Sequence, residues 1–196
     1  EAQRAVSSAA ATLEALRAVD SDVGLSNPLV AALAADEERV RCRLADLVDA
    51  EPEMESIVER LLGDDLAALV VNGSEDVTTL VERALAFAEK DGRAAIVSSA
   101  PSSSVPPAAG APGTPLISHL RVSDDARALL EALLGGVRVV EDAAAAVSAH
   151  ESAPSFTYVT RDGVVALPDG RVRVGTVATS ESGALERKRR IRELSG

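Results

Sequence analysis

The chain has 196 residues, a net charge of −11 and a pI near 4.7, with 46% apolar but only 2% aromatic residues. This length can bury a core in one domain or two small ones, and that core must consist mainly of Ala, Val, Leu and Ile. The acidity argues against a chain that wraps nucleic acid over its whole surface, and the scarcity of aromatics argues against base binding by stacking.

Cysteine usage and hydropathy restrict the class further. Cys42 is the single cysteine, so it cannot form an internal disulfide or a thiolate metal site. No run of about eighteen apolar residues predicts a membrane span, and no signal-like segment follows Glu1. These features favour a reducing cytoplasm. The chain begins without Met and ends within a helical pattern, so we expect a piece of a longer protein.

In the first half, helices and strands are predicted to alternate. A helix over residues 1–19 has apolar residues three and four positions apart, which gives a narrow, coiled-coil-like seam. The further predicted elements are a helix over 28–35 opened by Ser26-Asn27-Pro28, a strand over "RVRCRLADLVDA" with Val40, Cys42 and Leu44 on one face, a helix over 51–62 ended by Gly63, a strand over 66–71, a helix over 74–90 capped by Ser74 and a strand over 93–99.

A stretch rich in Pro, Ser and Gly over residues 98–114 predicts a loop or linker. Beyond it we expect a helix over 124–134, a strand over 137–140, a helix over 141–150, a strand over 155–160, a β meander with Asp-Gly turns at 162–163 and 169–170, and a basic helix over 184–194. Both halves share the order helix, Leu-Leu-Gly stop, Val-rich strand and acidic helix start, which favours two repeated α/β subdomains.

Three segments together resemble the hinge domain of bacterial structural-maintenance-of-chromosomes (SMC) proteins, the condensin-type ATPases. They are "LADLVDAEPEMESIVERLLGDDLAALVV", "LLGGVRVVEDAAAAV" and "YVTRDGVVALPDGRVRVGTVATSESGALERKRRIREL". The resemblance implies an α/β (α+β) fold of two pseudo-repeated subdomains, each a mixed sheet with packed helices, flanked by two antiparallel coiled-coil stubs. The implied parts are an ascending stub (1–20), subdomain 1 (26–99), a flexible linker (100–114), subdomain 2 (115–182) and a descending stub (183–196).

The resemblance also implies a function. Such a hinge is a non-enzymatic dimerisation module that joins two coiled-coil arms of a chromosome condensation and segregation ATPase, whose ATP-binding heads lie outside this chain. We therefore expect no cofactor and no metal, a second copy of the chain as the main partner, weak and local DNA contact, no membrane, and a cytoplasmic place on the nucleoid.

The predicted dimer contact lies on two sheet edges, because an edge strand is a template for another strand. Its residues are Arg41, Cys42, Arg43 and Ala45 in the first subdomain and Arg171, Val172, Arg173, Val174, Gly175 and Thr176 in the last strand. Hinges of this family usually carry paired glycines at both places. Here "RVRCRLADL" has none, and Gly175 has no second glycine beside it, so we expect the edges to meet with side chains between them.

A basic cluster in the last helix is the predicted DNA contact. It consists of Arg187, Lys188, Arg189, Arg190 and Arg192, which stand out in an acidic chain and could neutralise DNA phosphates. The alternative is a solvated helix face whose cations favour the helix C-terminus.

Two other classes stay open at this point. A small-molecule-binding α/β regulatory domain would use Gly63, Gly73 or the Gly135-Gly136 pair at strand ends. A hydrolase or transferase would use the carboxylates of Asp64, Asp65 and Asp76. Against an enzyme, no phosphate-cradling loop or nucleophile elbow is present, His119 and His150 lack metal-ligand spacing, and Cys42 is expected to be a small buried or interface residue.

Overall fold

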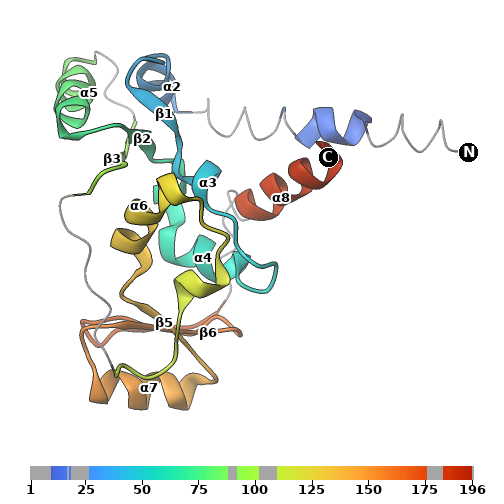
Figure 1. Ribbon diagram of the computed structural model, residues 1–196, viewed down its shortest axis with the longest axis vertical. Helices are drawn as coiled ribbons and strands as arrows, with labels where there is room; N and C mark the ends of the chain where they lie inside the picture. Colours follow the sequence, from blue (N-terminus) through green and yellow to red (C-terminus); the bar gives the residue numbers. More distant parts are fainter. Residues whose placement is uncertain are drawn as a thin grey trace, which may run out of the picture. The chain divides into compact units, whose positions relative to one another are not determined.

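The computed structural model describes residues 10–16, 18, 27–87, 92–101, 110–175 and 183–195. The chain forms two compact units, and Figure 1 labels most of their helices and several of their strands. Unit 1 comprises Glu1–Asp46, Asp64–Ser98 and Gly183–Gly196, and unit 2 comprises Leu47–Gly63 and Ser99–Ser182. These units differ from the contiguous subdomains expected from the sequence, because 47–63 belongs with the second unit.

Unit 1 is built on a three-stranded mixed sheet in the order β1-β2-β3. β1 (Val40–Arg43) pairs antiparallel with β2 (Leu69–Val71), which pairs parallel with β3 (Ile96–Ser98). The parallel pair requires a crossover, and α5 (Ser74–Ala86) supplies it. The remaining elements are α2 (Pro28–Ala34), α3 (Leu44–Leu47), the 3-10 helix η1 (Gly63–Ala67) and α8 (Ala184–Ser195).

The core of unit 1 is aliphatic, as the composition requires. It joins one face of α2 to the sheet and to α5, and its buried members are Leu29, Val30, Leu33, Leu69, Val71 and Leu80. The α2 start is fixed locally, because the Asn27 Oδ1 accepts hydrogen bonds from the backbone N–H groups of Leu29 (3.1 Å) and Val30 (3.3 Å). Pro28 follows at the first helical position, where no N–H is needed.

Unit 2 is built on a five-stranded mixed sheet in the order β4-β5-β6-β7-β8. Only β5 and β6 are parallel, and α7 crosses between them and packs on the sheet through Ala146 and Ala149 (Figure 1). The strands are β4 (Thr114–Pro115), β5 (Val137–Val140), β6 (Thr157–Thr160), β7 (Val165–Ala166) and β8 (Val172–Arg173). The helices are α4 (Glu55–Leu62), the 3-10 helix η2 (Leu116–His119), α6 (Asp124–Leu134) and α7 (Ala143–Ser152).

The predicted repeat is present in both halves. A helix, a strand and a crossover helix follow one another as α4, β2 and α5 and again as α6, β5 and α7. Each repeat also places its strand in a parallel pair. The repeat differs from the compact units, however, since α4 belongs to unit 2 while β2 and α5 belong to unit 1.

Several predicted boundaries were wrong for identifiable reasons. The first strand ends at Arg43 instead of continuing through Leu44, because the Asp46 carboxylate accepts the Arg43 backbone N–H (2.8 Å) and opens α3. Ser74 is the first helical residue of α5, and Gly73 takes the N-cap position. Residues 10–16 are helical as predicted. The other residues of the 1–20 prediction except residue 18, and 102–109 of the linker, lie outside the described residues.

Candidate functional site: sheet edges, a basic helix and a pocket

The first predicted contact surface coincides with an edge strand. In the described part of the chain, β1 lies at one end of its sheet and pairs only with β2. The register shifts between Val40 and Cys42, so Arg41 is the extra residue of a bulge and is exposed. Cys42 is half-buried. Ala45, by contrast, is 6% exposed within α3, so it lies off the strand.

The second predicted contact surface is the edge strand β8 of the unit 2 sheet. Among the described residues β8 is the last strand of its sheet, and Val172 pairs with Ala166 while Arg173 pairs with Val165. Val172 is 48% exposed and Val174, just beyond the strand, is 76% exposed. The strand is shorter than predicted, and Thr176 lies outside the described residues. Two apolar side chains are therefore open to solvent along this edge.

The turn before β8 is held by charge. The Arg171 guanidinium Nε donates to the Asp169 carboxylate (2.7 Å), and the Arg171 backbone N–H donates to the same side chain (3.0 Å). Both hydrogen bonds hold the pKa of Asp169 below its ordinary value, and the one from the Arg171 side chain has the larger effect. After the strand, Gly175 has φ +103° but open space where a Cβ would lie. Within the described chain, glycine is favoured here because it adopts a positive φ, and close packing does not require it.

The five cations of the predicted DNA contact do not act alike. Lys188 forms an ion pair with Asp46 and its side chain is only 17% exposed. Arg189 pairs with Glu193 one helical turn away (3.0 Å), and Arg187 is half-buried with its Nε enclosed. Arg190 and Arg192 are the exposed members of the set. The members of the cluster therefore differ in exposure, and Arg190 and Arg192 are the most accessible to solvent.

The two histidines lie apart in different settings. The His119 Nδ1 is 3.0 Å from a Glu51 carboxylate oxygen, and its Nε2 is 3.5 Å from the Thr114 hydroxyl. This contact reinforces a backbone pairing, since the Glu51 N–H donates to the His119 carbonyl (3.1 Å). His150 lies in α7 with its Nδ1 buried and without a hydrogen-bond partner. Among the described residues no group of three or more His, Cys, Asp or Glu side chains could hold a metal ion.

The carboxylates considered for the hydrolase alternative lie in two different helices. Asp64 and Asp65 belong to the first turn of η1, directly after the helix that Gly63 ends. Asp76 lies in the first turn of α5 and is 3.7 Å from the Arg39 guanidinium. Their positions match a helix stop and a charged helix start.

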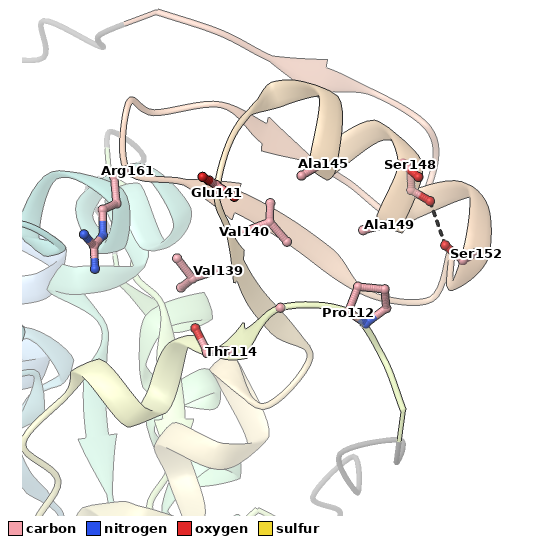
Figure 2. Close-up of a pocket in the computed structure, with 11 residues that line it drawn as sticks. Pro112, Thr114, Val139, Val140, Glu141, Ala145, Ser148, Ala149, Ser152 and Arg161 are labelled. Carbon is pink, nitrogen blue, oxygen red and sulfur yellow. Dashed lines mark hydrogen bonds between the residues drawn. The ribbon is translucent and has the colours of Figure 1, made fainter.

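A pocket that the sequence analysis did not identify lies in unit 2. It has a volume of about 610 Å³ and is lined by the end of β5, the start of β4 and one face of α7 (Figure 2). Glu141 and Arg161, the residues that directly follow β5 and β6, lie at its rim. The glycines of the small-molecule alternative are absent from its lining, where Gly113 is the glycine that contributes.

Two buried side chains of the unit 2 sheet, Arg138 and Tyr158, carry polar groups within a mainly aliphatic core. Arg138 is 7% exposed on β5, and its guanidinium lies 5.3 Å from the centre of the Phe156 ring. Burial raises the pKa of the neighbouring Tyr158 phenol above its ordinary value of 10.0, and the Arg138 charge opposes that rise. The Tyr158 hydroxyl donates to the Ala153 carbonyl (3.1 Å).

None of the described helices combines the length and the apolar character needed to cross a membrane.

Comparison with known proteins identifies the family of this chain. The family model described as "SMC proteins Flexible Hinge Domain" matches residues 37–150. The chromosome partition protein Smc of Myxococcus xanthus (strain DK1622) is 31% identical over 172 residues, which cover 84% of this chain and 14% of that protein. The chain thus spans about a seventh of the length of this relative.

Solved structures show the same fold. The hinge domain of Geobacillus stearothermophilus SMC, solved as an asymmetric dimer, superposes with a TM-score of 0.81 at 20% identity, over 99% of this chain and 82% of that one. The hinge domain of the Pyrococcus furiosus SMC protein superposes with a TM-score of 0.65 at 16% identity, over 86% of this chain and 89% of that one. Because the hinge model matches more than half of the residues, this chain belongs to the SMC family and is a flexible hinge domain.

Proposed function

We propose that this hinge domain joins two SMC arms by self-association, in which the β8 edge of one copy meets the β1 edge of a second. The observation that carries the proposal is the exposure of Val172 and Val174 at an edge strand, since soluble proteins usually protect such edges with charge or cover. The related Geobacillus hinge, solved as an asymmetric dimer, supports it. On β1 the contact would use Arg41, Cys42 and Arg43, because Ala45 is buried in α3.

The expected strength follows from the exposed fractions. Fully burying a valine side chain contributes at least about 1.5 kcal/mol, so covering the exposed half of Val172 and three quarters of Val174 gives roughly 2 kcal/mol per copy. Two equivalent contacts would therefore lower the Kd roughly 700-fold, and a single contact in an asymmetric pair only about 30-fold.

Light scattering over a wide concentration range tests this proposal on the doubly substituted chain Val172→Lys/Val174→Lys. The matched control is Leu85→Lys/Val147→Lys, which adds the same charge at side chains that are 82% and 46% exposed on helices α5 and α7. We expect the edge variant to dissociate and the control to keep the wild-type Kd. A monomeric wild-type chain at every concentration, or equal Kd values for the two variants, contradicts the proposal.

We also propose a local DNA contact through α8. Arg190 and Arg192 are exposed cations on one short helix of a chain with net charge −11, so any phosphate contact is confined to this region. The three other members of the cluster have pairing or packing roles and are expected to affect stability first.

For the whole protein, we propose that the hinge serves a chromosome-organising ATPase on the nucleoid, in the cytoplasm, with its ATP-binding heads outside this chain. The name of the Myxococcus relative, a chromosome partition protein, supports this role. In this proposal the hinge itself contributes geometry rather than catalysis.

A further inference from the structure

The pocket of unit 2 lies where small ligands commonly bind in α/β proteins, at the carboxyl ends of parallel strands. β5 and β6 are the parallel pair, and the pocket is lined by the last two residues of β5 and by the residues that directly follow both strands. Its volume of about 610 Å³ is within the usual range for small-molecule sites. Figure 2 shows its lining residues, which include Glu141 and Arg161 at the strand ends and extend along α7 to Ser152.

Two opposite charges stand at the rim without neutralising each other. Glu141 follows β5 and Arg161 follows β6, and neighbouring strands are only about 4.8 Å apart. Nevertheless, the Glu141 carboxylate has no hydrogen-bond or ion-pair partner in the described part of the chain. Arg161 contacts Glu53 at 3.6 Å, but both side chains are more than 60% exposed, so this pair is weak and easily displaced.

The body of the pocket is a groove of small side chains. Ala145, Ser148, Ala149 and Ser152 recur on one face of α7 over a length of about 10 Å. The Ser152 hydroxyl already donates to the Ser148 carbonyl (2.7 Å), so little donor capacity faces the groove there. Val139 and Val140 of β5 also line the groove, and beside them Gly113 contributes bare backbone. Such a groove accepts an apolar chain and offers few polar contacts.

From this arrangement we infer that the pocket binds a free α-amino acid with an apolar side chain. The ligand carboxylate pairs with Arg161 and its ammonium with Glu141, and the side chain extends along α7. An α-amino acid carries both charges on one carbon, which matches two opposite charges on adjacent strand ends. An acid or an amine alone would satisfy one rim charge and be repelled by the other.

Three probes that differ only at the head group test this inference. L-Norleucine carries both charges, hexanoate lacks the ammonium and pentylamine lacks the carboxylate. Binding to the whole chain is measured by ¹H–¹⁵N chemical shifts of Val139, Val140 and Ala145. We expect L-norleucine to shift these amides with a Kd of about 1 mM, and the other two probes to bind about tenfold more weakly.

Charge variants are expected to weaken the binding of one probe and strengthen the binding of another, depending on the position changed. Arg161→Gln should weaken L-norleucine about tenfold and strengthen pentylamine, and Glu141→Gln should do the same for L-norleucine while strengthening hexanoate. Glu53→Gln should tighten L-norleucine, because it removes the competitor for Arg161. Arg171→Gln, at an exposed arginine outside the pocket lining, is the matched control and should change nothing.

Binding at another surface is distinguished by filling the groove. Ala145→Leu should abolish the L-norleucine shifts, with its native fold checked by unchanged amide shifts on β7 and β8. The inference is overturned if L-norleucine shifts no pocket amide, if all three probes bind equally, or if the rim variants leave the probe preference unchanged. None of these outcomes depends on whether the chain self-associates.

Discussion

Gly113 gives a quantitative test of the unit 2 packing that forms the pocket wall. It precedes β4 with φ +83°, and a Cβ there would lie 2.5 Å from the Val139 carbonyl oxygen and 2.8 Å from a Val140 methyl group. Gly170 has nearly the same backbone angle, φ +85°, but nothing lies within 4 Å of its Cβ position. The substitutions Gly113→Ala and Gly170→Ala therefore both place an L-residue at positive φ and differ in the steric overlap.

The two terms have different magnitudes. A left-handed backbone costs an L-residue about 1–2 kcal/mol, so Gly170→Ala should lower the free energy of unfolding by that amount. At Gly113 the overlap is with a strand carbonyl, which cannot move without disturbing the β4–β5 pairing, so about 1–3 kcal/mol is added. We expect Gly113→Ala to lose roughly 2–5 kcal/mol in total.

Urea unfolding monitored by tyrosine fluorescence measures this difference within one unit. Tyr158 is the single tyrosine of the chain and lies in unit 2, as do both glycines. The m value should stay constant while the midpoint falls further for Gly113→Ala. Equal losses for the two variants, within about 0.5 kcal/mol, would refute the close approach at Gly113.

Two further predictions concern the Tyr158 phenol and the exposed arginines of α8. The Tyr158 phenol should ionise above pH 10.0 in absorbance titration, because burial raises its pKa; the stability linked to it is present below the ordinary pKa and is lost as pH rises through the folded value. A midpoint at or below 10.0 in the folded chain would contradict this. Arg190→Gln/Arg192→Gln should reduce DNA retention and lower the salt slope of binding by about 2, with little change in stability. Retention equal to wild type at low salt would remove the proposed contact.

The sequence predicted best where one local signal determines an element. The bounds of α6 and β5 agree with the predicted 124–134 and 137–140, because a helical apolar repeat ends in Gly135 and a Val-rich run follows. The start of α2 is equally local, since Asn27 supplies both capping hydrogen bonds. The edge position of β8 could also be anticipated, because its alternating pattern closes a meander.

Features that depend on distant pairing could not be predicted in the same way. Segment 47–63 belongs to unit 2 because the Glu51 N–H bonds to His119 and Ala50 forms a bridge with Leu120, contacts that leave no local pattern. The pocket was missed for a related reason. Glu141 and Arg161 become neighbours only through the parallel pairing of β5 and β6.

The ion pair between Asp46 and Lys188 has a mechanical consequence. Asp46 is the last residue before the chain leaves unit 1, and Lys188 belongs to the helix with which it returns, 142 positions later. All of unit 2 lies within the loop that this contact closes. Tension applied to α8 against β1 would therefore be carried by unit 1 alone while the contact holds. Once this ion pair and the packing of the buried Leu185 are lost, force on α8 would also pass through the segments of unit 2.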